Sequence, residues 1–239
     1  MEVIMSFRIK IKNITLATIL CLSTILLSAA PQLSQFKFNA ASVLFETTKK
    51  ENGQSVRYVL LAREAFGKDK GTWDDFGGKR DPNEHRPSET ASREAQEEMN
   101  AGNTLGWSVN NMKKYISLSQ NTNTSMVLAL QKIKYVTYVT NIPYAHVCTL
   151  GQNFFSARTK TKSFHHLEKD GLALVRYDDL MHTVKNGNPT VKAYILDKKT
   201  NCFTLSSTIK LRPVLHKKLE GLACGHTYTQ GTNNKIRFY

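Results

Sequence analysis

A chain of 239 residues can form one good-sized domain, or at most two small ones. Its composition, 41% hydrophobic and 22% charged with 13 Gly and 6 Pro, excludes a disordered or fibrous protein. The formal net charge of +14 favours anionic partners such as polyphosphates, nucleic acid or an anionic membrane surface, although such a charge can also serve solubility alone.

The first thirty residues have the order of a secretory signal peptide. Arg8, Lys10 and Lys12 form a basic head, and an apolar run that starts at Ile14 leads to small residues ending at Ala30. This run is short for a membrane-spanning helix, which needs about 20 apolar residues. We therefore expect a cleaved signal peptide over residues 1–30 and an exported domain over residues 31–239. An uncleaved membrane anchor is the alternative.

Three cysteines lie outside this leader: Cys148, Cys202 and Cys224. An odd number permits one disulfide at most, and three widely spaced cysteines without a C-x-x-C pair make a poor zinc site. We expect either buried small residues or one disulfide with one free thiol.

Apolar and β-branched runs separated by polar segments predict strands along most of the chain. The predicted strands are residues 41–45, 58–62, 126–130, 135–140, 172–177, 191–196 and 202–205. A helix is predicted from Pro87 to about Met99, because proline suits the first helical position. Further helices are predicted over residues 178–184 and 207–219. Strands that come first and outnumber the helices indicate an α+β fold with a mixed sheet flanked by helices.

The predicted helix after Pro87 carries a group of three acids. Glu94, Glu97 and Glu98 stand at positions i, i+3 and i+4, so their carboxylates project from one helical face. Like charges at this spacing destabilise an isolated helix by a few tenths of a kcal/mol, roughly. A bound divalent cation reverses that effect, and ligands that are all oxygens select Mg²⁺ or Mn²⁺. An acidic helical face can also be merely solvated.

Neighbouring residues add to this pattern. On the opposite helical face, Ala91 and Ala95 are small enough to let the helix lie close to a sheet. Arg93 can pair with Glu89 or Glu97 and so hold a carboxylate in one rotamer. The preceding glycines, Gly77 and Gly78, permit a tight turn and a close approach of the backbone to a phosphate.

These residues resemble the Nudix box, G-x5-E-x7-R-E-U-x-E-E-x-G-U, where U is aliphatic. The chain has Gly78, five residues, Glu84, eight residues, and then Arg93-Glu94-Ala95-Gln96-Glu97-Glu98. It departs from the pattern in a spacer that is one residue too long and in Asn100, which replaces a glycine and tolerates the same cap conformation. Since family members often carry a proline six positions before the arginine, as Pro87 is here, the insertion falls at His85-Arg86. Helical register is then intact, and only the role of Glu84 is in doubt.

The resemblance implies a Nudix-like α/β/α sandwich that hydrolyses a diphosphate linkage in a nucleoside diphosphate joined to another group. It implies Mg²⁺ or Mn²⁺ held by Glu94, Glu97 and Glu98, with Arg93 beside them. Glu97 is the first choice for the general base and Glu168 the second, although a lone Glu in such a segment is more often a surface charge. The predicted substrate contacts are Gly77, Gly78, Lys79 and Arg80.

Two other interpretations stay open. The first is a Nudix-fold module that binds a nucleotide or phosphorylated ligand without cleaving it, which the extra loop residue would suit. The second is a basic protein of nucleic acid or membrane surfaces whose glutamate-rich helix is incidental. The partner we expect is a small-molecule diphosphate, with no specific nucleic acid, and a membrane only if the leader stays uncleaved. His165 and His166, beside Glu168, are the kind of paired loop histidines that are more often merely exposed.

Overall fold

The computed structural model describes residues 36–99, 105–121, 125–130, 132–223, 228–230 and 234–238. The predicted signal peptide lies outside these residues, so its cleavage and the export of the chain stay predictions. Every element described below belongs to one compact unit, Phe36–Tyr239. Among the helices in the described ranges, none is long and apolar enough to cross a membrane.

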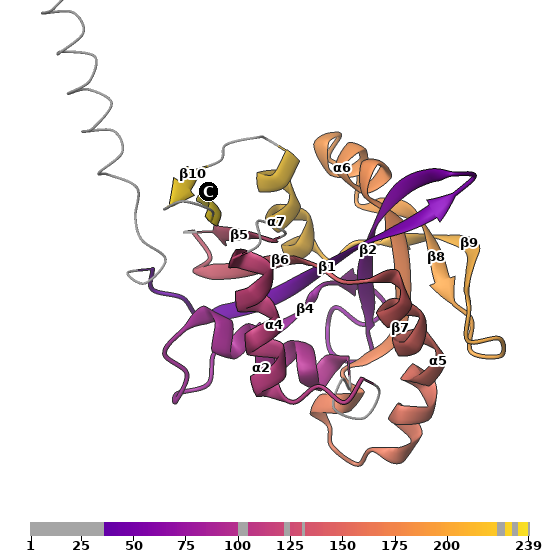
Figure 1. Ribbon diagram of the computed structural model, residues 1–239, viewed down its shortest axis with the longest axis horizontal. Coiled ribbons are helices and arrows are strands. Elements are labelled where there is room, and N and C mark those ends of the chain that lie inside the picture. The colour runs from indigo at the N-terminus through magenta and orange to yellow at the C-terminus, as the bar shows by residue number, and fades with distance from the viewer. Residues whose placement is uncertain are drawn as a thin grey trace, which may run out of the picture. The chain divides into compact units, whose positions relative to one another are not determined.

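The described strands form one mixed sheet (Figure 1). Its main path runs through β10 (Tyr228–Gln230), β11 (Asn234–Phe238), β5 (Ser125–Leu130), β6 (Tyr135–Asn141), β1 (Ala40–Glu51), β2 (Gln54–Glu64), β7 (Lys169–Arg176), β8 (Thr190–Leu196) and β9 (Phe203–Lys210). The short β3 (Trp73–Asp74) pairs with β2, and β4 (Phe76–Lys79) pairs with β1. The pairs β1–β6 and β11–β5 are parallel, and the other described pairs are antiparallel.

Helices cover both faces of this sheet. In Figure 1, α6 (Tyr177–Lys185) and α7 (Pro213–Ala223) lie on one side of it, and α2 (Pro87–Glu98) and α4 (Val109–Asn121) lie on the other. The remaining helices in the described residues are α5 (Tyr144–Lys160) and the short 3₁₀ helix η2 (His165–Leu167). This arrangement confirms the predicted α+β fold, a mixed sheet flanked by helices.

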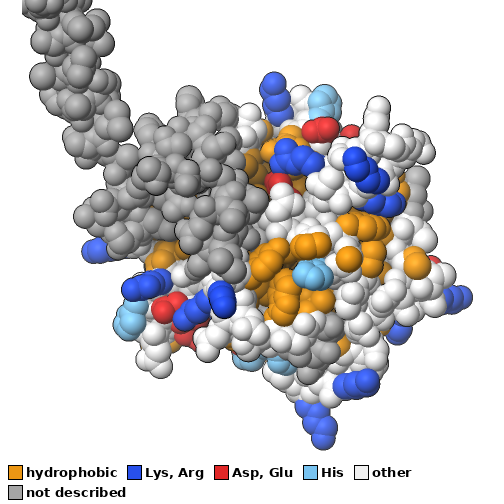
Figure 2. All heavy atoms as spheres, in the orientation of Figure 1, with side chains coloured by type: hydrophobic (Ala, Val, Ile, Leu, Met, Phe, Trp, Pro, Cys, Tyr) orange, Lys and Arg blue, Asp and Glu red, His pale blue; other side chains and the backbone are white. Residues whose placement is uncertain are grey.

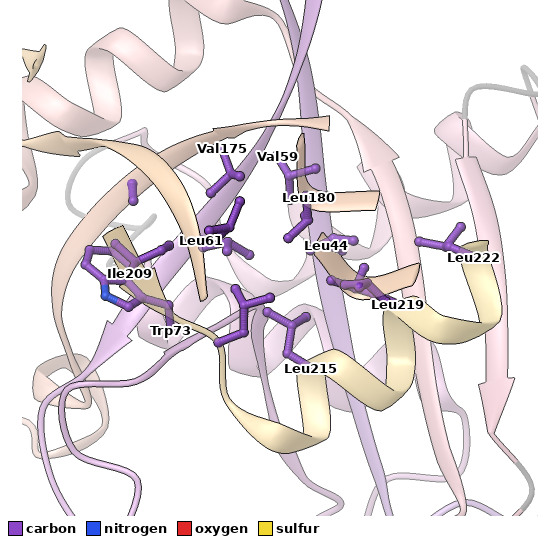
Figure 3. Packing of buried hydrophobic residues seen from close by; sticks show 14 of the residues in the cluster. Leu44, Val59, Leu61, Trp73, Val175, Leu180, Ile209, Leu215, Leu219 and Leu222 are labelled. Carbon is purple, nitrogen blue, oxygen red and sulfur yellow. The ribbon is translucent and has the colours of Figure 1, made fainter. Parts of the chain in front are cut away.

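Alternation along the strands explains why both faces need cover, since successive side chains point to opposite sides. On one face, Leu44 joins the cluster that Leu180, Leu215 and Leu219 of α6 and α7 complete (Figure 3). On the other face, the ring of the next residue, Phe45, lies 5.6 Å from that of Phe76. A sheet buried on both sides fixes the positions of the strands from which the candidate site is built.

Ion pairs attach α7 to the end of β3. The ammonium of Lys218 is buried and lies 3.2 Å from Asp74 Oδ1 and 2.5 Å from Asp75 Oδ1. Arg212, just before α7, contacts Asp74 and Glu64. Asp74 and Asp75, which precede the glycine pair, are therefore already paired with cations from α7 and from the residue just before it.

Each predicted strand falls within or at the edge of an observed strand, and the helix predicted from Pro87 to Met99 is α2. The helix predicted over residues 207–219 is wrong in its first half. Residues 207–210 continue β9 and pair with residues 190–193 of β8, and the helix begins at Pro213. The β-branched Thr208 and Ile209 fit a strand, and pairing with β8 decides their conformation.

Candidate active site on helix α2

Helix α2 lies against the sheet through its small residues. Ala91 and Ala95 have no exposed surface, as predicted for a helix that packs closely. This close packing also draws two of the three acids inward: Glu94 is 8% exposed and Glu98 is 3% exposed, whereas Glu97 is half-buried. The acidic face is therefore not merely solvated, because most of it is removed from water.

Arg93 is the centre of the charge network on α2. Its Nη1 lies 2.9 Å from Glu94 Oε1 and 3.1 Å from Glu97 Oε2, and its Nε donates to Glu84 Oε1 over 2.9 Å. The predicted pairing with Glu97 is confirmed. Glu84 also contacts Arg93, so the insertion at His85-Arg86 leaves this contact in place.

Glu89 does not pair with Arg93, contrary to the alternative drawn from helical spacing. Its Oε2 accepts hydrogen bonds from the backbone N–H groups of His85 and Arg86, and its Oε1 lies 3.3 Å from Lys113 Nζ of α4. Glu89 thus caps the N-terminus of α2, where backbone N–H groups have no partner within the helix.

The glycine pair does not form the tight turn that the sequence suggested. Gly77 and Gly78 lie in β4 opposite Ser42 and Ala41 of β1, and neither has a positive φ. A Cβ on Gly77 would lie 2.1 Å from Ser42 Cβ, and a Cβ on Gly78 would lie 2.5 Å from Glu94 Oε1. Glycine is required here by close packing, and at Gly78 the group that approaches is the candidate ligand Glu94.

Lys169 is a site residue that sequence reasoning missed. Its ammonium lies 3.1 Å from Glu98 Oε1 and 2.6 Å from Glu64 Oε1, and the side chain is 1% exposed. The other oxygen of Glu98, Oε2, accepts the N–H of Gly77 over 2.7 Å. In the sequence Leu167-Glu168-Lys169-Asp170 this lysine resembles a surface residue, and only its place at the start of an apolar strand gives a signal.

The segment around η2 approaches the C-terminal end of α2. His166 Nδ1 lies 2.8 Å from the carbonyl oxygen of Glu97, whereas His165 is exposed and lies 3.2 Å from Glu168 Oε1. The expectation of exposed histidines is right for His165 and wrong for the half-buried His166. Glu168, the second candidate base, is half-buried and near enough for its charge to raise the pKa of Glu94.

Lys79 and Arg80, the two predicted substrate contacts that carry a charge, are both exposed. The carbonyl oxygen of Lys79 accepts a hydrogen bond from Arg93 Nη2. Arg80 donates from Nε to the carbonyl oxygen of Glu84, and its guanidinium lies 5.1 Å from the ring centre of Phe38. Lys79 thus joins the α2 network through its backbone, and Arg80 joins the loop that precedes α2.

Burial changes the acidity of the α2 carboxyls. Desolvation raises the pKa of Glu94 to about 7, although Arg93 opposes the shift. Burial also raises the pKa of Glu98 well above its usual range, against the opposing effect of Lys169. The available cations therefore leave the ionised forms of both acids incompletely compensated.

The donor set fits a hard divalent cation in its chemistry. Three carboxylates lie along one turn of α2, and two of them are buried with too little positive charge nearby, which a divalent ion would supply. Within the described residues, no group of three or more His, Cys, Asp or Glu side chains is arranged to hold a metal ion. In the structure Arg93 and Lys169 contact glutamate oxygens in this region.

The described cysteines take no part in this site. Cys148 and Cys202 are free thiols, and Cys224 lies outside the described residues. Cys148 is half-buried and Cys202 is exposed, so the expectation of buried cysteines is wrong for Cys202.

Comparisons with solved structures find Nudix proteins at low similarity. A mutT/nudix family protein from Listeria innocua is 14% identical, with 60% of this chain and 80% of that chain covered and a TM-score of 0.32. The Nudix hydrolase RenU from M. smegmatis is 16% identical, with 78% and 84% covered and a TM-score of 0.33. A NUDIX hydrolase from Nitrosomonas europaea is 14% identical, with 79% and 72% covered and a TM-score of 0.30. These TM-scores are too low to add to an assignment.

The family comparison is more direct. No curated protein matches the chain. The model of the NUDIX domain matches residues 37–139, a range that contains β1, β2, the glycine pair and the whole of α2. The chain is therefore similar to the NUDIX family over residues 37–139, the part that carries the box residues on α2.

Proposed function

We propose that the chain hydrolyses the diphosphate linkage of a nucleoside diphosphate joined to another group, with Mg²⁺ or Mn²⁺ held by Glu94, Glu97 and Glu98. The observation that carries this proposal is the burial of Glu94 and Glu98 beside Gly77 and Gly78. Carboxylates at this depth are costly unless a cation or hydrogen bonds compensate them.

A bound divalent ion would neutralise diphosphate oxygens and polarise the attacking water. The side chains of this chain would position the acids and supply the general base. Arg93 fixes Glu94, Glu97 and Glu84 relative to one another through three contacts of about 3 Å. Glu97 is the proposed general base because it is the most accessible of the three proposed metal ligands, and Glu168 is the second candidate.

The basic character of the chain suits an anionic substrate. Lys and Arg side chains lie along the rim of the face seen in Figure 2, and the formal net charge is +14. A positive field raises the rate at which polyphosphates reach the protein without selecting among them. We therefore propose a small-molecule diphosphate as the substrate class.

The test is a panel of diphosphates incubated with the purified chain and Mg²⁺, with products identified by mass spectrometry. Nucleotide sugars, dinucleoside polyphosphates and non-nucleotide diphosphates belong in the panel. We expect a monophosphate and a phosphorylated second product. Glu97→Gln should lower the rate by about 100-fold or more while substrate binding persists. Binding of a panel member by the wild type without any cleavage would favour the non-catalytic module instead.

A further inference from the structure

A cavity of about 410 Å³ lies between the start of β7 and the end of β8. These two strands pair at two positions, Ala173 with Ile195 and Leu174 with Tyr194, so the first residues of β7 are not hydrogen-bonded to β8. None of the residues that line the cavity belongs to α2. Its volume is within the range of small-ligand sites, about 300 to 1,000 Å³.

Two arginines that line this cavity have only one carboxylate between them. Arg63 donates from Nε to Asp170 Oδ1 over 2.7 Å. Arg158 uses Nη1 for the carbonyl oxygens of Leu167 and Lys169, and within the described residues it has no ion pair and no hydrogen-bond partner for Nε or Nη2. Guanidinium N–H groups that no protein acceptor takes up are therefore present at the cavity wall.

Positive charge exceeds negative charge around the cavity. The charged residues that line it are Asp170 and the cations Arg63, Arg158 and Lys198. The nearby Asp197 does not line it, and its Oδ1 accepts the backbone N–H groups of residues 199 and 200. Burial lowers the pKa of Arg158, Asp170 opposes the shift, and the like charge of Arg63 adds to it. A bound anion would compensate this excess of positive charge.

The rest of the cavity wall is largely apolar and partly aromatic. Its apolar side chains are Trp73, Phe155, Ile195 and Leu196. The guanidinium of Arg63 lies 6.0 Å from the ring centre of Trp73, so a cationic and an aromatic contact lie next to each other. Flat rings pack against aromatic side chains and against the plane of an arginine.

We propose that this cavity binds a small organic anion in which a phosphate or carboxylate group is joined to a flat ring. Arg63 and Arg158 bind the anionic group, since the fork of a guanidinium matches two oxygens of an oxyanion. Trp73 and Phe155 contact the ring. The proposal is independent of the proposed function, because no acid of α2 takes part in it.

The experiment is isothermal titration calorimetry of the full chain with phenyl phosphate and with benzoate, in EDTA so that no metal ion takes part. We expect binding of at least one of these ring-bearing anions. Inorganic phosphate, which lacks the ring, and phenol, which is uncharged, should bind at least about 10-fold more weakly. Arg63→Gln should weaken binding of the ring-bearing anion about 10- to 100-fold, because a hydrogen bond to a charged group is lost.

Lys198→Ala and Lys199→Ala are a matched pair of variants. Both lysines are exposed and adjacent in sequence, but only Lys198 lines the cavity. Lys198→Ala should weaken binding about 2- to 5-fold, whereas Lys199→Ala should leave it unchanged. In Trp107→Phe, Trp73 is the only tryptophan, so its emission should change on titration with the same dissociation constant as in calorimetry.

Three results would overturn the proposal. The first is no binding of either ring-bearing anion by the wild type, which does not depend on any variant folding. The second is inorganic phosphate that binds as tightly as phenyl phosphate and benzoate. The third is an equal loss of affinity in the two lysine variants, which would assign binding to the general positive field of the chain. Binding in the cavity without cleavage of any diphosphate would contradict the proposed function and leave this inference standing.

Discussion

Gly78 of β4 lies directly against Glu94, a candidate metal ligand. A Cβ there would lie 2.5 Å from Glu94 Oε1, so Gly78→Ala must displace this carboxylate. We expect metal affinity or turnover to fall by about 10- to 100-fold, as when a group that orients a ligand is lost. Mn²⁺ titration and steady-state rates would measure the effect.

Gly77→Ala is the companion variant. Its Cβ would meet Ser42 Cα at 2.5 Å, which is backbone of β1 and cannot rotate away. This variant should lower the melting temperature more than Gly78→Ala does. Equal melting temperatures for the two variants, with unchanged metal binding in Gly78→Ala, would contradict the packing described for the pair.

Glu84 makes a pH-dependent contribution to stability. Burial alone would raise its pKa, but hydrogen bonds from Arg93, Thr90 and the Asp81 N–H lower it below the usual 4.5. A carboxyl with a lowered pKa in the fold contributes stability that is present above the unfolded pKa and is lost as pH falls through the folded pKa. At pH 7, Glu84→Gln should therefore cost about 1 kcal/mol.

The measurement is urea denaturation of the wild type and Glu84→Gln at pH 7 and near pH 3. The difference between the two proteins should shrink at the lower pH, where the wild-type carboxyl becomes protonated. A difference that grows toward low pH would show that the sign given to the Glu84 shift is wrong.

At the scale of an element, the N-terminus of α2 is held by Glu89. Its carboxylate accepts the N–H groups of His85 and Arg86, so Glu89→Ala should lower the free energy of unfolding by about 1 kcal/mol, as loss of a helix cap does. Lys113→Ala removes only the ion pair with α4 and should cost less than about 0.5 kcal/mol. Chemical denaturation of both variants tests this, and equal losses would assign the stabilisation to the ion pair.

Helix α7 is held by the buried ammonium of Lys218. Lys218→Ala leaves Asp74 and Asp75 buried without their ammonium, which should cost about 3 to 5 kcal/mol. Lys217→Ala, its neighbour on the less buried side of α7, is the control and should change stability little. Thermal denaturation of both variants decides whether the Lys218 pair is structural, since a small loss for Lys218→Ala would show that α7 is held by its leucines alone.

At the scale of the whole molecule, local signals were sufficient for α2 and for most strands. Pro87, the two alanines and the spacing of the three glutamates all act within one helix, so its register could be predicted despite the insertion before it. Partners from distant segments could not be predicted in this way. Lys169 meets Glu64 because β7 pairs with β2, and residues 207–210 form a strand because β8 pairs with them.

We propose that the acids of α2 direct water to a phosphorus atom with the help of a divalent ion. The most direct measurement is cleavage of the best panel substrate in ¹⁸O-labelled water, with Mg²⁺ and after its removal by EDTA. We expect one ¹⁸O atom in a phosphate-bearing product and loss of cleavage in EDTA. Cleavage that survives EDTA, or label found only in a product without phosphate, would contradict it.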